Sequence, residues 1–275
     1  MQRLFLITLL GLLPLLTFAS GPVKTDQVTA ELVSESAGIQ PGTPFWVGVR
    51  LDMEDHWHTY WTNPGDAGLG TSLTWDLPEG FSAGPIIWPT PEYIPLEPLV
   101  SYGYEGTTLL MVRLDPPADL PVGQSVDLRV RADWLACQEF CIPGGADLSL
   151  SRPVVGETPG PDPAQAELFA RTRADLPLVG VGWPVSLSGA GDRLQLDVRL
   201  PDGSVVDPET VFFFNRVEMV IEPAASQEVT FEAGVLSIKL TPAVYADGPV
   251  DAISGVLVAR SGFGDSVPGN AVVLE

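Results

Sequence analysis

Hydrophobic and polar residues alternate along several short stretches of the chain. The longest alternation covers residues 126–134, where Val, Leu, Ala and Trp at the even positions are separated by Asp and Arg. Residues 193–200 repeat the pattern, with Leu and Val at the even positions, and residues 45–51 carry their apolar side chains at the odd positions. A period of two predicts β-strands that bury one face.

Shorter apolar runs predict further strands at residues 106–114, 146–151 and 256–259. Two more runs, 229–231 and 235–240, stand on either side of Ala233-Gly234. A short connection of this kind between apolar runs predicts a β-hairpin.

The two regions of alternation are separated by a proline-rich segment and a helical pattern. Residues 153–163 carry four prolines and two glycines, which is typical of a linker. Residues 164–175 have the pattern of a short helix that ends before Pro177. We therefore expect an all-β protein with two immunoglobulin-like β-sandwich domains, residues 22–155 and 164–275, joined by a Pro-rich linker and a short helix.

The composition supports this fold class and excludes some functions. There are 27 prolines and 28 glycines in 275 residues, which disfavours long helices, and 45% of the residues are hydrophobic, which is enough for a core. The formal net charge is -21. A chain this acidic lacks the basic surface that nucleic acids or anionic membranes require.

The first residues have the features of a secretory signal peptide. Arg3 is followed by a nearly continuous apolar run from Leu4 to Leu16, and small residues precede a cleavage position after Ala19. We expect residues 1–19 to be removed and the mature protein to be exported. No later run is long enough to span a bilayer, so we expect no transmembrane segment in the mature protein.

The two cysteines of the chain, Cys137 and Cys141, are the first candidates for chemistry. Four extended residues span about 13 Å, whereas the Cα atoms of a disulfide lie about 4.4–6.8 Å apart, so a bond between them requires a turn at residues 138–140. Closing so small a loop stabilises a protein by only about 2 kcal/mol. The spacing leaves a redox disulfide and a structural one open. Asp133 and Glu139 would raise a nearby thiol pKa, which suits a disulfide that a partner thiolate attacks.

Several separated motifs around this pair point to one family. The sequence resembles the periplasmic N-terminal domain of DsbD-type thiol:disulfide interchange proteins over about residues 25–155, most closely their ScsB-like branch. The second half resembles that branch more weakly, at residues 211–214 and 254–258. The motifs that carry the resemblance in the first half are HTYWTNPGDAG at 58–68, WDLPEG at 75–80, WP at 88–89, YGYEG at 102–106 and ADWLACQEFCIP at 132–143.

The resemblance implies a thiol-disulfide exchange protein of the protein-disulfide reductase type that needs no cofactor. Cys141 would form mixed disulfides with partners and Cys137 would resolve them, after which the dithiol reduces a client. The family also has an aromatic cap loop over the disulfide. The corresponding stretch here is 92–104, with Tyr93, Tyr102 and Tyr104 as candidate caps.

The resemblance also implies the partners. The family fuses this region to a transmembrane electron carrier and a thioredoxin-like domain, neither of which follows here. We therefore expect reducing equivalents to arrive in trans from a membrane-embedded thiol-reducing protein and to pass to thioredoxin-like periplasmic clients. The cysteine spacing is also shorter than in the best-known members of the family.

Copper handling is an alternative interpretation of the same residues. His56 and His58 would point to one face if both lay on a strand, and Met53 is close in sequence. Together with Cys137 and Cys141 they would form a set of soft ligands suited to Cu(I). The competing interpretation places His58 in a packed aromatic motif.

A binding module without redox chemistry is a third possibility. Its aromatic platform for a sugar or a peptide would consist of Trp57, Tyr60, Trp61, Trp75, Trp88 and Tyr93. The alternative is that these rings pack in the core, as Trp and Tyr usually do in sandwiches. The second domain contains no Cys or His, so we expect it to serve docking or spacing.

Overall fold

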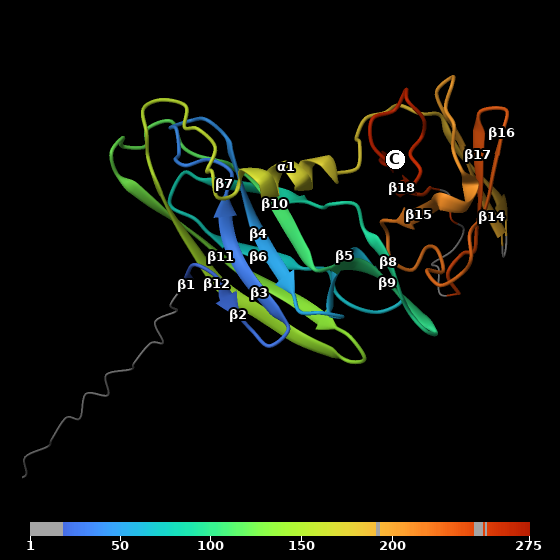
Figure 1. Ribbon diagram of the computed structural model, residues 1–275, viewed down its shortest axis with the longest axis horizontal. Helices are drawn as coiled ribbons and strands as arrows, with labels where there is room; N and C mark the ends of the chain where they lie inside the picture. Colours follow the sequence, from blue (N-terminus) through green and yellow to red (C-terminus); the bar gives the residue numbers. More distant parts are fainter. Residues whose placement is uncertain (1–18, 191–192, 245–249, 251) are drawn as a thin grey trace, which may run out of the picture.

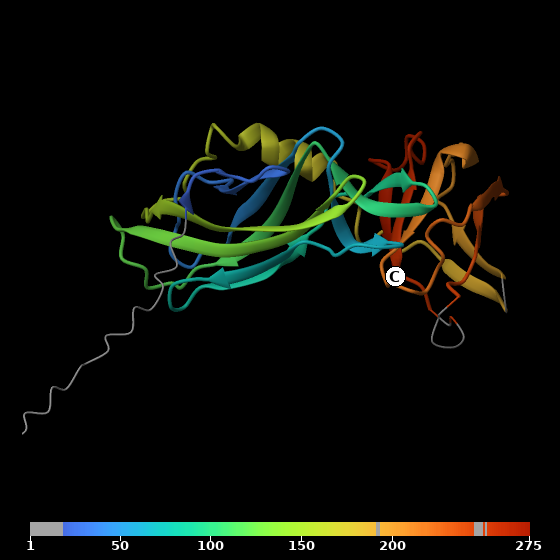
Figure 2. The same ribbon diagram turned by 90° about the horizontal axis from the view of Figure 1, so that it is seen from below.

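The computed structural model of the chain describes residues 19–190, 193–244, 250 and 252–275. The expected signal peptide lies outside these residues except for its last position, so its cleavage stays a prediction. The described chain is an all-β protein made of two sandwiches that lie side by side along the long axis of the molecule (Figures 1 and 2). This confirms the predicted fold class.

The first sandwich consists of a seven-stranded and a five-stranded sheet. The seven-stranded sheet contains, in spatial order, β1 (Ala19–Ser20), β12 (Cys141–Pro153), β11 (Ser125–Cys137), β5 (His58–Gly65), β9 (Leu99–Glu105) and β8 (Glu92–Leu96), with β6 (Ser72–Asp76) paired to β11. The five-stranded sheet contains β2 (Val23–Lys24), β3 (Val28–Ser34), β4 (Phe45–Met53), β10 (Thr107–Asp115) and β7 (Ser82–Ile87).

The alternating residues of the sequence form the core between these sheets. Leu128, Val130 and Ala132 of β11 are fully buried, whereas the Asp and Arg residues between them are not. Val47 and Val49 of β4 face them from the other sheet, in the same cluster. The strands predicted at 126–134 and 45–51 are therefore confirmed, together with their buried faces.

The helix α1 (Ala166–Ala174) packs on the outer face of the five-stranded sheet, beside β10 (Figure 1). Its Phe169 is fully buried against Val33, Leu109 and Met111. The expected domain bounds placed this helix in the second domain, but its apolar side joins it to the first sandwich. In the described part of the chain no helix is long and apolar enough to cross a membrane.

The proline-rich segment before the helix also lies along the first sandwich. Val154 is buried and forms a β-bridge with Ile39, and Pro161 forms another with Ser36. Arg152 makes an ion pair with Asp162 over 2.8 Å. The expected linker is therefore held at several points along its length.

The second sandwich consists of a four-stranded and a three-stranded sheet. Ala233 and Gly234 have φ angles of 49° and 77°, which is the backbone of a tight hairpin turn, as the sequence predicted. A 3-10 turn, η1 (Pro208–Thr210), precedes the three-stranded sheet. The strands in spatial order are β13 (Val185–Ala190), β14 (Arg193–Arg199), β17 (Val235–Leu240) and β16 (Glu228–Glu232), then β15 (Val211–Asn215), β18 (Gly255–Ala259) and β19 (Ala271–Leu274).

The three-stranded sheet is buried on both faces and joins the two sandwiches. Phe213 and Leu257 belong to the core of the second sandwich, whereas Phe214, Val256 and Val258 belong to the core of the first. A sheet covered on both sides needs no polar face, which explains the continuous apolar runs at 211–214 and 256–259. The relative position of the two sandwiches is therefore fixed by a shared core.

Candidate functional site

The two cysteines form a disulfide at the tip of the longest hairpin in the first sandwich. Strands β11 and β12 stay in register from the pair Ser125 and Pro153 to the pair Cys137 and Cys141. The Cα atoms of the two cysteines are 4.1 Å apart. The turn between them is closed by a hydrogen bond from the backbone N–H of Gln138 to the carbonyl of Phe140, 3.2 Å long. This confirms the turn predicted at residues 138–140.

The two sulfur-bearing residues differ in their exposure to solvent. Cys137 ends β11 inside the fold and is 1% exposed. Cys141 begins β12 on the outside and is exposed. The disulfide therefore joins one cysteine inside the fold to one on the surface.

Strand β5 supplies the side chains beside the disulfide. His58 is the register partner of Cys137 on one side and of Glu105 in β9 on the other. Side chains two residues apart share a face of a strand, so Tyr60 lies on the same face as His58. The hydroxyl oxygen of Tyr60 lies 3.6 Å from the Sγ atom of Cys141. The rings of His58 and Tyr60 meet edge to face, with centroids 5.1 Å apart.

Burial controls the protonation of these two side chains. His58 is 1% exposed, and burial lowers its pKa from 6.5 to about 4, so its ring is neutral at pH 7. Its Nε2 atom is buried and has no hydrogen-bond partner within the described residues. Burial raises the pKa of Tyr60, against a smaller lowering by a hydrogen bond with Ser101, so the phenol keeps its proton at neutral pH.

An exposed aromatic residue lies in the turn next to Cys141. Phe140, in the turn between the two cysteines, is 62% exposed. Its ring meets that of Trp57 edge to face, with centroids 6.0 Å apart. The neighbouring Glu139 is also exposed. A docking protein would therefore meet one exposed aromatic ring and one carboxylate next to the disulfide.

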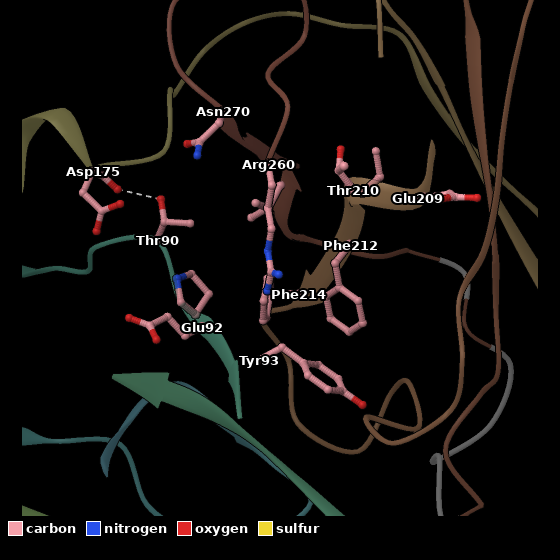
Figure 3. A pocket seen from close by; sticks show the side chains of 13 residues that line it. Thr90, Glu92, Tyr93, Asp175, Glu209, Thr210, Phe212, Phe214, Arg260 and Asn270 are labelled. Carbon is pink, nitrogen blue, oxygen red and sulfur yellow. Dashed lines mark hydrogen bonds between the residues drawn. The ribbon is translucent and has the colours of Figure 1, made fainter. Parts of the chain in front are cut away.

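Two of the three candidate cap tyrosines, Tyr93 and Tyr102, contact the second sandwich at the junction, and Tyr104 packs inside the first. Tyr93 meets the ring of Phe212 at 5.0 Å, beside a cavity of about 360 Å³ between the sandwiches (Figure 3). Tyr102 is buried against Phe212 and Phe214. The hydroxyl of Tyr104 donates to the carbonyl of Pro89 over 2.9 Å. These contacts offer no support for a cap role, which stays a prediction.

The candidate copper ligands are not assembled into one site. Strand β5 begins at His58, and His56 precedes it in a turn with φ of 69°, so the expectation of both histidines on one strand face is wrong. The sulfur of Met53 accepts a hydrogen bond from Thr59, whose side chain faces away from His58 and Cys137. Among the described residues no three His, Cys, Asp or Glu side chains lie close enough together to hold a metal ion. Copper binding stays an untested prediction.

The proposed aromatic platform is mostly part of the core. Tyr60 and Trp61 are buried. The others are half-buried and pack against the core of the first sandwich: Trp57, Trp75, Trp88 and Tyr93. Rings distributed in this way fill the sandwich and form no exposed stacking surface.

The sequence did not predict the roles of two residues at the site, Phe140 and Gly68. Phe140 was visible inside the Cys-x3-Cys motif, but its exposure depends on the turn. Gly68 closes the loop over Tyr60, because a Cβ atom at this position would lie 2.4 Å from the tyrosine ring, and its φ of 135° also favours glycine. Its place within the NPGDAG motif was the available signal.

A disulfide at a hairpin tip of an immunoglobulin-like sandwich, with one cysteine buried and the other exposed, is an arrangement that thiol-disulfide exchange can use. Residues 28–153 match the family described as thiol:disulfide interchange protein DsbD, N-terminal. This part of the chain is a DsbD-type N-terminal domain. The match covers the cysteine pair and all the side chains around it.

Comparison with solved structures extends the likeness to both sandwiches. The fold is similar to the N-terminal periplasmic domain of ScsB from Proteus mirabilis, with a TM-score of 0.65 and 15% sequence identity, over 92% of this chain and 96% of that one. Domains 5-6 of the S-layer protein SbsC align over 93% and 98% at 11% identity, but their TM-score of 0.25 supports no argument. No curated protein sequence matches the chain.

Proposed function

We propose that the protein relays reducing equivalents by thiol-disulfide exchange through Cys137 and Cys141. The observation that carries the proposal is the unequal exposure of the two residues, with Cys141 exposed and Cys137 1% exposed. A purely structural disulfide gains nothing from an exposed cysteine, whereas an exchange protein needs one that a partner can approach. The DsbD-type family of residues 28–153 supports the same function.

The protein is reduced in two steps. A thiolate of a reduced partner attacks the Sγ atom of Cys141, the S–S bond breaks, and its electron pair leaves with Cys137 as a thiolate. A second thiolate of the partner then attacks the partner's own sulfur in the mixed disulfide. Cys141 leaves as a thiolate, the partner holds a new disulfide, and the protein holds two thiols.

A client is reduced by the reverse sequence. The Cys141 thiolate attacks a client disulfide and forms a mixed disulfide, releasing one client thiolate. Cys137 then attacks the sulfur of Cys141, which restores the internal disulfide and releases the second client thiolate. Cys137 is well placed for this step, because the hairpin register keeps it opposite Cys141.

We infer that these partners act in the periplasm. A membrane-embedded thiol-reducing protein would supply the electrons, and thioredoxin-like proteins would receive them. The family and the periplasmic origin of the similar ScsB domain support this location. The second sandwich would hold the first in place, since the two share a core.

Single-cysteine variants test the proposal. Cys137→Ser leaves the exposed thiol, and we expect it to trap a mixed disulfide with a thioredoxin-like protein whose own resolving cysteine is removed. Cys141→Ser leaves the buried thiol and should trap little or none. Equal trapping by both variants, or trapping by neither, would contradict the proposal.

A redox titration provides the thermodynamic test. We expect the midpoint of the mature protein in thiol buffers to lie within about -180 to -270 mV, the range of known exchange proteins. A midpoint below about -300 mV is typical of structural disulfides and would contradict the proposed relay. Counting free thiols by alkylation and mass spectrometry gives the reduced fraction directly.

A further inference from the structure

The hydroxyl of Tyr60 is directed at the sulfur that a partner attacks. Its oxygen lies 3.6 Å from the Sγ atom of Cys141. A disulfide sulfur carries no hydrogen, so the phenol must be the donor in this contact. The rest of the tyrosine is inside the fold, because the residue is 2% exposed.

The surroundings of Tyr60 hold its ring in this direction. The loop at Gly68 covers the ring so closely that a side chain at position 68 would overlap it. His58 packs edge to face against the ring from two residues earlier on β5. Gly103 is the register partner of Tyr60 on β9, and a Cβ there would meet the backbone oxygen of Thr59 at 2.0 Å. Both flanking positions therefore require glycine.

The charges near Cys141 make such a donor useful. Glu139 is two residues away in the turn, and Glu105 is the register partner of His58 on the neighbouring strand. His58 is neutral at pH 7, so it does not offset them. Carboxylates disfavour a nearby thiolate, whereas a hydrogen bond to the thiolate favours it. The hydroxyl of Tyr60 is close enough to the sulfur of Cys141 to supply that bond.

We propose that Tyr60 is a catalytic residue of the exchange reaction, donating a hydrogen bond from its hydroxyl to the Cys141 thiolate. The thiolate forms when the partner leaves and acts again when a client disulfide is attacked, so one donor serves both half-reactions. The proton stays on the phenol, and the electron pairs move between sulfur atoms as described above. His58 is a positioning residue that holds the ring. This inference rests on the proposed function of Cys141.

The test uses Tyr60→Phe, which removes the hydroxyl and keeps the ring. In the Cys137→Ser background Cys141 is the only thiol, so the pH profile of its alkylation by iodoacetamide reports its thiolate directly. We expect Tyr60→Phe to shift the profile to higher pH and to slow alkylation at pH 7 by about threefold to tenfold, the effect of losing one hydrogen bond to a charged group that is partly solvated. The rate at high pH should be unchanged.

Thr172→Val is the control. It removes a buried hydroxyl from α1 that donates to the carbonyl of Leu168, on a helix outside the disulfide site, and it should leave the alkylation profile unchanged. An equal shift in both variants would indicate a general effect of packing and overturn the assignment. An unshifted Tyr60→Phe profile would overturn it as well. If Cys137→Ser still traps a partner in that case, only the role of Tyr60 fails and the relay stands.

Discussion

The side-chain amide of Asn63 donates a hydrogen bond to the backbone carbonyl of Asn215 over 2.7 Å, and this buried bond crosses from the first sandwich to the second. The carbonyl of the same side chain accepts from the backbone N–H of Gly65 over 3.1 Å. Asn63 lies three residues after Tyr60 on β5. One strand therefore carries both the side chain beside the disulfide and the polar contact between the sandwiches.

Removing this amide is expected to weaken the junction. Asn63→Ala removes the side-chain partner of the half-buried N–H of Gly65 and of the buried carbonyl of Asn215, and an unpaired buried group costs about 1–3 kcal/mol. The free energy of unfolding, measured with urea, should fall by at least that amount. Asn270→Ala alters an exposed asparagine and should change the free energy by less than about 0.5 kcal/mol. If Asn63→Ala lowered the free energy of unfolding as little as Asn270→Ala, the Asn63 contact would contribute nothing to stability.

Stability should depend on pH through His58. Its pKa is about 4 in the folded protein and about 6.5 when unfolded, so the unfolded chain binds the proton first as the pH falls. Neutral His58 contributes fully to the free energy of unfolding above about pH 6.5. This contribution is lost as the pH falls toward 4 and amounts to about 3 kcal/mol in all. We expect His58→Phe to reduce the slope of unfolding free energy against pH in this window.

His56 provides the control for this measurement. It is exposed and lies in a left-handed turn, a conformation that asparagine also tolerates. His56→Asn should keep the slope of the parent protein. The carboxylates that titrate in the same window are common to all three proteins, so the difference in slope isolates one histidine. A His58→Phe slope equal to that of the parent would refute the buried neutral state.

The packing of α1 on the first sandwich should contribute to the stability of the protein. Phe169→Ala leaves a cavity against Val33, Leu109 and Met111, and such truncations cost about 3–5 kcal/mol. The unfolding midpoint should fall, and the amides of α1 should exchange hydrogen faster. Ala170→Gly, on the exposed side of the same helix, should cost only about 1 kcal/mol. Similar losses in the two variants would mean that the helix depends on local propensity and that its packing adds little.

The sequence allowed strands and turns to be predicted where local rules are sufficient. The alternation at 126–134, the Ala-Gly hairpin at 233–234 and the turn between the cysteines all follow from side-chain period, φ preference or the reach of a disulfide. The placement of α1 did not follow, because Phe169 is apolar whichever sandwich it contacts. Gly103 of β9 pairs with Tyr60 of β5, so Tyr102 and Tyr104 point to the opposite face of the sheet, into the interior. The pairing of two strands cannot be predicted from the sequence of either strand alone. The position of Tyr60 beside Cys141 also depends on how the strands pair, so the sequence did not predict it.

The carboxylate in the cysteine turn should slow attack by anionic thiols. Glu139 is exposed and two residues from Cys141, so it repels an incoming thiolate through water by about 0.6 kcal/mol at about 7 Å. We expect Glu139→Gln to speed reduction by glutathione about twofold to threefold at low salt. The gain should disappear near 1 M salt, where the Debye length is about 3 Å. Glu79→Gln, which removes an exposed carboxylate from a different loop, should leave the rate unchanged. An acceleration that persists at high salt would point to a change in the conformation of the turn, and the electrostatic explanation would then be wrong.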